Sequence, residues 1–159
     1  MRPSKHEWAM QMAQIVATRS TCLRRQVGCV LVNERHHILA TGYNGVAAGL
    51  PHCNEIPMGY TTHLNACPGA QSLSGQNLDG CEAIHAEQNA LLQCPNVHEI
   101  MVAYVTVSPC MTCTKLLLNT SCKSIMFLED CAHNKARILW ERSGRYWSKL
   151  IPGMPVMKI

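Results

Sequence analysis

At 159 residues and 17.6 kDa, the chain has room for one domain with a sizeable core, but not for two. Its hydrophobic fraction of 47% excludes a disordered or collagen-like chain. Charged residues make up 15% of the chain, against about 25% in an average protein, and this shortage hints at surface that is buried in an oligomer. The net charge of +4 is mild and the basic residues form no long run, so a small phosphate-bearing substrate suits the chain as well as a nucleic acid does.

Neither a secretion signal nor a membrane span is visible in the sequence. The first seven residues lack an apolar core, and the longest uncharged apolar run, residues 100–114, contains Pro109 and is too short to cross a bilayer. We therefore expect a cytoplasmic protein, in which thiols stay reduced. Ten cysteines in such a compartment indicate metal binding before disulfides.

The first part of the chain predicts a helix followed by a hairpin. Ser4 and Glu7 form a capping-box pattern, and apolar residues follow at helical spacing over about 5–18. Two β-prone runs, 27–32 and 37–41, flank a polar turn and predict a hairpin. The His36-His37 pair at this turn is expected to be solvated rather than to bind metal.

A long segment without periodicity follows the hairpin. Residues 44–80 are rich in Gly, Pro, Asn and Ser, and a loop of this length inside a domain needs a function or a staple. The segment contains Cys53 and Cys67, and Cys81 follows it directly.

Helices and strands alternate after this loop. Helices are expected at 83–94, 110–119 and 132–143, and strands at 99–107, 123–128 and 145–151. Together with the opening hairpin, this order predicts one α/β domain over 1–159, a three-layer α/β/α sandwich with a central mixed five-stranded sheet. Trp140 and Trp147 are expected to pack in the core or at a subunit contact.

Two short fragments at predicted helix starts carry the chemistry. They are His85-Ala86-Glu87 and Pro109-Cys110-Met111-Thr112-Cys113. Each is ambiguous alone, but together and in this order they match the H-x-E…P-C-x-x-C signature of zinc deaminases. One imidazole nitrogen and two thiolates would fill three positions of a tetrahedral zinc and leave the fourth for water. The helix N-termini would stabilise the thiolates of Cys110 and Cys113.

Glu87 is expected to carry protons rather than to bind the metal. Zinc brings the pKa of its bound water to about 7 and so supplies hydroxide at neutral pH. Two thiolate ligands blunt this effect, which makes a nearby carboxylate base more necessary. In this hypothesis the hydroxide attacks C4 of cytosine, while Glu87 takes the water proton, passes it to ring N3 and then protonates the departing amine.

Several longer stretches resemble the deoxycytidylate (dCMP) deaminases. They are Thr41-Gly42-Tyr43-Asn44-Gly45, residues 85–91 (HAEQNAL) and residues 104–113 (YVTVSPCMTC). Residues 20–22 and 27–28 also resemble the bacterial and phage branch of that family, and the resemblance extends from about 22 to 128. It implies a cytidine deaminase-like fold and zinc-dependent conversion of dCMP to dUMP with release of ammonia, which supplies thymidylate synthesis.

The resemblance also implies contacts with the substrate and with effectors. Asn44 should contact the deoxyribose, and the Ala86 amide and Ser108 should border the cytosine pocket. Family members are typically homohexamers that dCTP activates and dTTP inhibits, at an interface site that here would include Gly42, Tyr43 and Gly45. This chain departs from some members by lacking a basic residue near Pro95-Asn96 that supports assembly or regulation.

Two features of the substrate stay open at this stage. Arg24 and Arg25 are both candidates for binding the phosphate, and the sequence does not choose between them. For the same reason dCTP is an alternative substrate beside or instead of dCMP.

Some phage and bacterial relatives hold a second, closed zinc site. The positions that correspond to Cys22 and Cys53 contribute to it in those proteins. We predict a four-cysteine structural zinc site here, with His52 or His63 as alternative ligands; its members are Cys22, Cys53, Cys67 and Cys81. The alternative is four unrelated buried thiols. The other cysteines are expected to behave as small buried hydrophobes; they are Cys29, Cys94, Cys122 and Cys131.

Two other function classes compete with the leading hypothesis. A deaminase that acts on a base in tRNA or single-stranded DNA should show a basic channel or stacking aromatics, and aromatic residues are only 5% here. The other class is a zinc-ribbon-like binding module or a thiol redox protein. It would leave the presence of Glu87, and the position of His85 before the cysteine pair, to chance.

Overall fold

A five-stranded sheet forms the centre of the computed structural model, which describes residues 1–55, 67–73, 76–131, 135–151 and 153. The strand order is β2-β1-β5-β6-β7. The strand β1 (Gly28–Val32) runs antiparallel to β2 (Ile38–Tyr43) and to β5 (Val102–Val107). The strands β6 (Ser124–Glu129) and β7 (Tyr146–Lys149) continue parallel to β5. The predicted mixed sheet of five strands is therefore confirmed.

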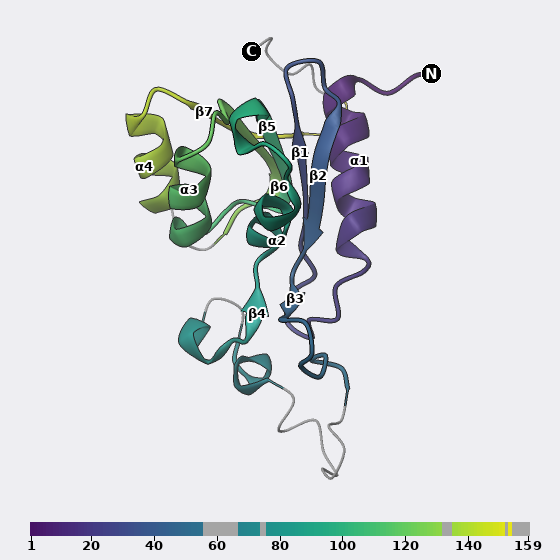
Figure 1. Ribbon diagram of the computed structural model, residues 1–159, viewed down its shortest axis with the longest axis vertical. Coiled ribbons are helices and arrows are strands. Elements are labelled where there is room, and N and C mark those ends of the chain that lie inside the picture. Colours follow the sequence, from purple (N-terminus) through teal and green to yellow (C-terminus); the bar gives the residue numbers. More distant parts are fainter. Residues whose placement is uncertain (56–66, 74–75, 132–134, 152, 154–159) are drawn as a thin grey trace.

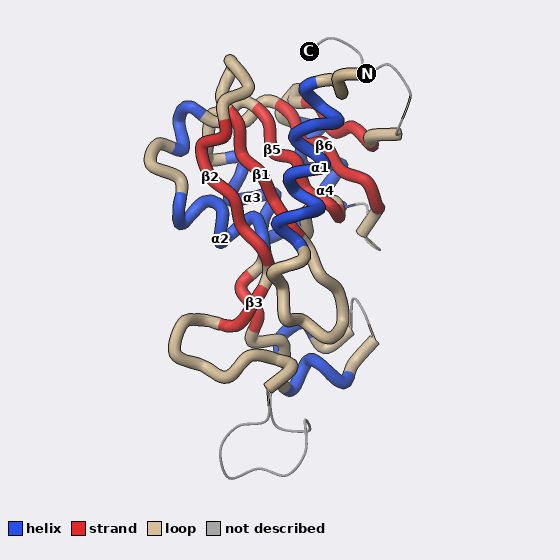
Figure 2. The backbone as a smooth tube through the Cα atoms, turned by 90° about the vertical axis from the view of Figure 1, so that its right-hand side faces the viewer, coloured by secondary structure: helices blue, strands red, loops and turns tan. Residues whose placement is uncertain are grey.

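Helices cover both faces of this sheet. Figures 1 and 2 show α1 (Lys5–Ala17) alone on one face. On the other face lie α2 (Ala86–Gln93), α3 (Met111–Leu118) and α4 (Lys135–Arg142). The predicted three-layer sandwich is confirmed. None of the described helices has the length and apolar character needed to cross a membrane.

The largest departure from the predicted elements lies just before α2. The sequence predicts a helix from 83, but Ala83–Ile84 form the short strand β4, which pairs antiparallel with β3 (Gly45–Val46). His85 keeps the extended backbone (φ −71°, ψ 157°), so the helix begins only at Ala86. The helical periodicity of this region did not reveal β4, because the residues that pair with it lie 37 and 39 positions earlier in the chain.

Other element ends differ by a few residues. A 3₁₀ turn (Val97–Glu99) replaces the predicted start of the strand at 99. The helix predicted from 132 is observed from Lys135, and 132–134 lie outside the described residues. Two more 3₁₀ turns, Pro68–Gln71 and Leu78–Gly80, lie in the long loop.

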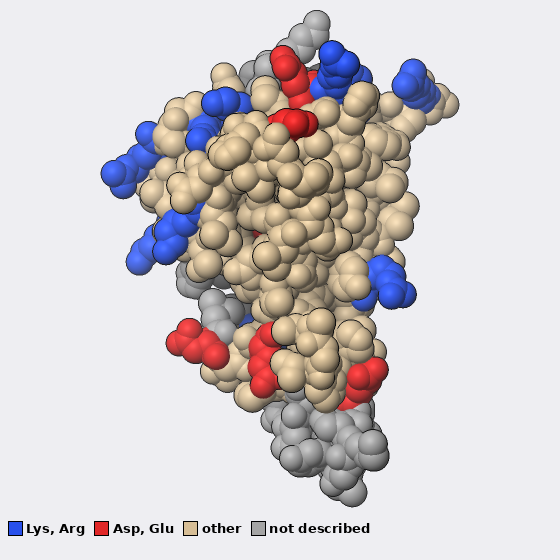
Figure 3. Space-filling model, viewed as in Figure 1, with Lys and Arg blue, Asp and Glu red and all other residues tan. Residues whose placement is uncertain are grey.

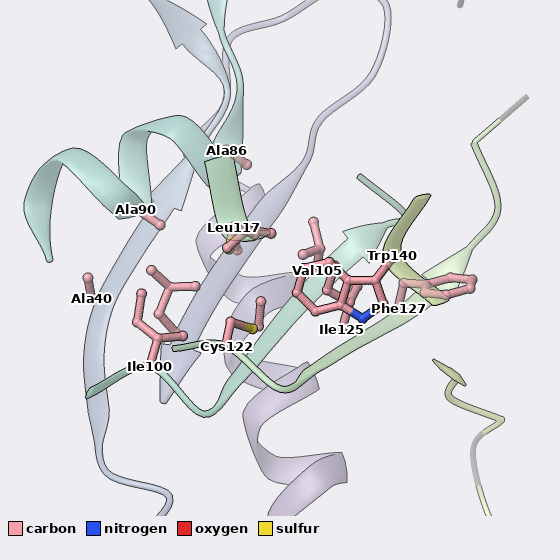
Figure 4. Packing of buried hydrophobic residues seen from close by; sticks show 13 residues of the cluster. Ala40, Ala86, Ala90, Ile100, Val105, Leu117, Cys122, Ile125, Phe127 and Trp140 are labelled. Carbon is pink, nitrogen blue, oxygen red and sulfur yellow. The ribbon is translucent and has the colours of Figure 1, made fainter. Parts of the chain in front are cut away.

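Buried side chains fill both interfaces of the sandwich. One cluster joins the sheet to the three-helix layer and includes Trp140, Leu117 and Ile125 (Figure 4). The other joins the sheet to α1 and includes Met10 and Tyr104. As expected, Trp140, Cys29 and Cys122 are fully buried, and Trp147 packs against the first cluster.

The helix α1 lies very close to the sheet. Ser4 and Glu7 form the predicted capping box at its start, and small side chains such as Ala9 and Ala13 form its buried face. A Cβ added to Gly28 of β1 would stand 2.0 Å from the Ala13 carbonyl oxygen. Only glycine therefore lets the two backbones approach this closely.

A polar cluster is buried between α1 and the sheet. Tyr104 of β5 is fully buried, and its hydroxyl lies 2.7 Å from Nδ1 of His6. The His36 ring stands edge-on to that of His6, with centroids 5.4 Å apart, so His36 is half-buried rather than solvated as the sequence suggests; His37 is exposed. Burial lowers the pKa of both His6 and His36, and the nearby Lys5 ammonium adds to this effect.

These histidines predict a loss of stability in mild acid. Because their pKa values are lower in the folded protein, these two residues bind more protons in the unfolded chain, so their contribution to the free energy of unfolding falls as pH drops below about 6.5. Urea unfolding at pH 7.5 and pH 5.5 measures this contribution, and His6→Gln should lose less stability between these pH values than the wild type does. The matched control His98→Gln changes an exposed histidine and should behave like the wild type. An undiminished acid response in His6→Gln would contradict the assignment.

Candidate metal centre

His85 enters the site from the end of a strand. It lies between β4 and α2 as the residue that precedes the first turn of the helix, and its backbone N–H donates to Oε1 of Gln88 at 2.8 Å. This hydrogen bond satisfies an amide at the helix start and fixes the turn on which the imidazole is mounted.

Cys110 and Cys113 enter the site from the start of the neighbouring helix. The strand β5 ends at Val107, and Cys110 takes the position before the first turn of α3 with an extended backbone. Pro109 precedes Cys110 where no helical N–H is required. Cys113 lies one turn on and is fully buried.

The three predicted ligands converge in space. Nδ1 of His85 lies 3.5 Å from Sγ of Cys110 and 3.5 Å from Sγ of Cys113. Among the described residues, they form the only group of three or more metal-ligating side chains whose ligand atoms all lie within 4.8 Å of one another. One nitrogen and two sulfur donors suit zinc, and three ligands leave one tetrahedral position open, as catalytic sites do. The donor set therefore fits a catalytic zinc ion.

The electrostatics of this set favour a bound cation. Hydrogen bonds from Cys113 and His85 lower the pKa of Cys110 to about 4, which makes it a thiolate at neutral pH. Donation to Cys110, together with burial, raises the pKa of Cys113, and the hydrogen bond to Cys110 raises that of His85. The free N–H groups at the start of α3 also stabilise the thiolate. Cys110 thus supplies a charged sulfur donor where a metal would sit.

Glu87 lies beside these ligands but is not one of them. It occupies the first turn of α2, its side chain is 4% exposed, and burial raises its pKa to about 7. A backbone hydrogen bond to the carboxyl and the nearby His85 ring partly oppose this rise in pKa. A carboxyl group with this pKa can both accept and donate a proton near neutral pH. The arrangement can therefore activate water beside a metal and move its proton.

Comparison with known proteins agrees with this centre. The family model for the cytidine and deoxycytidylate deaminase zinc-binding region matches residues 3–129. The chain belongs to this deaminase family. It is 38% identical over 130 residues to deoxycytidylate deaminase of Schizosaccharomyces pombe, in an alignment that covers 79% of this chain and 37% of the yeast protein. It is 35% identical over 130 residues to deoxycytidylate deaminase of Mycobacterium phage D29, covering 81% of this chain and 98% of the phage protein.

A solved structure shares the fold of this deaminase-family chain. It is the dCMP deaminase of cyanophage S-TIM5 in complex with dCMP and dUMP, with a TM-score of 0.71 and 25% identity over 94% of this chain and 99% of that one. Relatives differ in length, since this chain spans less than two fifths of each of the two yeast deoxycytidylate deaminases that it matches.

The predicted substrate residues hold loops around the centre. Asn44 is nearly buried; its Oδ1 accepts from the Val27 N–H and its Nδ2 donates to the Arg25 carbonyl, both at 2.8 Å. Ser108 Oγ accepts from the Cys131 N–H at 2.7 Å. Ala86 is fully buried at the start of α2. Sequence reasoning missed the loop contacts of Asn44 and Ser108, because 17 to 23 residues separate the partners and no local pattern marks them.

The residues predicted for effector binding join β2 to α2. Gly42 lies against the helix backbone, since an added Cβ would stand 2.2 Å from the Ala86 carbonyl oxygen and 2.3 Å from the Ala90 nitrogen. The Tyr43 carbonyl accepts from Asn89 Nδ2 at 2.8 Å. Gly45 pairs with Ile84 and faces open space. The packing of Gly42 positions α2, the helix that carries Glu87.

The four other predicted ligands also gather, but less tightly. Cys53 and Cys67 are buried. Burial raises the pKa of Cys53, and the nearby thiols of Cys67, Cys22 and Cys81 add to this rise. In the described part of the chain, no three of these sulfurs lie within 4.8 Å of one another. Of the alternative ligands, His52 bonds with Thr21, whereas His63 lies outside the described residues.

The tight contact at Gly42 generates a stability prediction. Gly42→Ala should lower the free energy of unfolding by about 1–3 kcal/mol, because the methyl group must push α2 away from β2. The matched control is Gly45→Ala, since an added Cβ there meets nothing within 4 Å. Chemical denaturation measures both variants. Equal stabilities would contradict the close approach.

Proposed function

We propose that the chain catalyses the hydrolytic deamination of dCMP to dUMP with release of ammonia. The observation that carries this proposal is the convergence of His85, Cys110 and Cys113 beside the buried carboxyl of Glu87. Family membership supports the reaction class. The names of the yeast and phage relatives, and the dCMP and dUMP bound in the cyanophage structure, support the substrate.

In this proposal His85, Cys110 and Cys113 would hold a zinc ion, which would make water nucleophilic at neutral pH. Glu87 accepts a proton from the attacking water and delivers it to N3 of cytosine, which makes C4 electrophilic, and the water oxygen bonds to C4. The same carboxyl then takes the proton of the new C4 hydroxyl and transfers it to the amino group, so that the C4–N bond breaks, ammonia leaves and a C4 carbonyl remains. Burial of Glu87 suits both tasks, because its raised pKa keeps proton transfer in either direction nearly balanced.

Three residues would orient the nucleoside in this proposal. We assign the Ala86 amide and Ser108 to the border of the cytosine pocket and Asn44 to the deoxyribose. The Asn44 side chain makes two hydrogen bonds with the backbone of residues 25–27, and these occupy one of its two N–H groups and one lone pair of its oxygen. A second N–H and a second lone pair remain for a sugar hydroxyl. Asn44 can therefore bind substrate and hold the loop at the same time.

Ammonia release from dCMP, dCTP, CMP and deoxycytidine, measured in parallel, tests the reaction. We expect turnover of dCMP well above the others and a loss of about 10²–10⁴-fold in Glu87→Ala, which should keep its zinc. The control Glu34→Gln changes an exposed carboxylate of the β1–β2 turn and should leave the rate unchanged. Near wild-type activity in Glu87→Ala would refute the mechanism. Faster turnover of dCTP than of dCMP would show that dCTP, not dCMP, is the substrate.

Arg25 is the stronger candidate for the phosphate. Arg24 is engaged, because its Nη1 donates to the Gly69 carbonyl at 2.7 Å. Arg25 instead forms an ion pair with Glu129, whose carbonyl accepts from the Ser108 N–H at 2.8 Å. Its own carbonyl is held by Asn44. Arg25 thus lies between the proposed cytosine-side and sugar-side residues, where a 5′-phosphate would emerge.

Arg25→Gln should therefore weaken the binding of a nucleotide more than the binding of a nucleoside. Loss of a charge-assisted hydrogen bond should raise KM for dCMP about 10–100-fold and change KM for deoxycytidine little. Steady-state kinetics on both substrates measure this difference. Arg35→Gln, an exposed arginine in the β1–β2 turn, is the control. Equal effects on both substrates would show that Arg25 acts on structure rather than on the phosphate.

A second, structural zinc bound by Cys22, Cys53, Cys67 and Cys81 belongs to the same proposal. The support is that Cys22, Cys67 and Cys81 all lie close enough to Cys53 to raise the pKa of its thiol. A four-thiolate site is the closed type that zinc adopts in structural roles. Such a site would contribute to the folding free energy of the long loop.

Assembly and regulation complete the proposal. For the assembly we propose a homohexamer, which the low share of charged residues, 15%, supports because it suggests surface buried between subunits. Control by dCTP and dTTP near Gly42, Tyr43 and Gly45, and a cytoplasmic location, stay predictions. On the face shown in Figure 3, lysines and arginines stand apart without a continuous stripe, which favours a small nucleotide over a nucleic-acid strand.

A further inference from the structure

The long cysteine-containing loop is closed at its base by a two-stranded ribbon. The strands β3 and β4 pair Gly45 with Ile84 and Val46 with Ala83. We call the described residues beyond this ribbon, 47–55, 67–73 and 76–82, the cysteine lobe. Figures 1 and 2 show it projecting from one end of the sandwich. Asn44 immediately precedes β3 and His85 immediately follows β4, so the base of the lobe is also the edge of the candidate metal centre.

This ribbon is too short to hold His85 by itself. Each strand has two residues, and even longer isolated two-stranded ribbons are only marginally stable. The position of β4 must therefore depend on what holds the lobe beyond it.

The lobe is connected to the site through two cysteines and one arginine. Sγ of Cys67 accepts from the N–H of Glu82, the residue before β4, at 3.5 Å. The Gly69 backbone lies against Cys81, where an added Cβ would stand 2.7 Å from Cα. Arg24 Nη1 donates to the Gly69 carbonyl at 2.7 Å. Arg24 belongs to the loop that carries Cys22 and adjoins the contacts of Asn44 with Arg25 and Val27.

We infer that the cysteine lobe is a positioning element for the catalytic centre, and that Arg24 transmits its position to the nucleotide-side loop. When Cys22, Cys53, Cys67 and Cys81 are held together, Glu82 and β4 are fixed, and with them the approach of His85 to its partners. The inference rests on the proposed function and deepens it.

The test uses the full chain and reads the hold on the catalytic zinc rather than activity alone. Zinc per chain is measured by mass spectrometry, and zinc release to a chromogenic chelator by stopped flow. We expect two zinc ions in the wild type and one in Cys53→Ser, with the remaining zinc released about 10-fold faster or more, as when groups that orient metal ligands are removed. Cys94→Ser, a half-buried thiol at the end of α2, is the matched control and should equal the wild type.

Arg24→Gln keeps every cysteine and so separates positioning from misfolding. It should retain two zinc ions and a wild-type circular dichroism spectrum. It should nevertheless release the more rapidly lost of its two zinc ions several-fold faster than the wild type does. If Cys53→Ser does not fold, this variant decides the question.

The outcomes distinguish the inference from the function on which it rests. One zinc per chain that survives Cys67→Ser unchanged would overturn the lobe site and the inference together. Two zinc ions in the wild type, with the remaining zinc of Cys53→Ser released at the wild-type rate, would overturn the positioning role and leave deamination intact. Where Cys53→Ser does not fold, zinc release at the wild-type rate from Arg24→Gln would have the same meaning. Failure of the wild type to release ammonia from dCMP, with faster zinc release in the lobe variants, would refute the proposed function but support the inference.

Discussion

Two helix starts that meet at one buried point are the constraint on which the rest of the structure depends. His85 stands before the first turn of α2, and Cys110 stands before the first turn of α3. Each helix presents free N–H groups at the position where a thiolate or carboxylate must be kept in a nonpolar interior. Backbone packing contributes to this meeting point, since Gly42 of β2 lies directly against the backbone of α2. A centre built on rigid elements keeps its ligands within the small tolerances that metal binding requires.

Burial has a double effect at this centre. It disfavours charge on Glu87 and raises the pKa of that carboxyl, while hydrogen bonds within the ligand set keep Cys110 charged. The surroundings thus shift the pKa values of neighbouring groups in opposite directions. For this reason one small site can hold a metal and still move protons near neutral pH. The fully buried Cys29, in β1 beneath Glu87, adds a nonionised thiol to this interior, since burial raises its pKa well above the ordinary value.

Around this centre, side chains hold loops to one another over long stretches of sequence. Asn44 holds the 25–27 backbone, Arg25 reaches Glu129 across 104 positions of the chain, and Arg24 reaches the cysteine lobe. The proposed phosphate end, sugar end and lobe are therefore mechanically connected. Exposed ion pairs of this kind contribute little to stability, and their value lies in orientation.

Residue type and spacing alone determined much of this protein. The capping box at Ser4, the hairpin, the alternation of later helices and strands, and the H-x-E and P-C-x-x-C fragments all carry local signals, because helical and strand periodicity and the choice of metal ligands depend on near neighbours. The tertiary structure alone decided the contacts between distant segments: the pairing of β3 with β4, which shortens α2 and leaves His85 outside it; the burial of His36 against His6; and the hydrogen bond of Arg24 to the Gly69 carbonyl. These features follow from which backbones can approach and which polar atoms find partners once the chain is packed, and no local pattern encodes that choice.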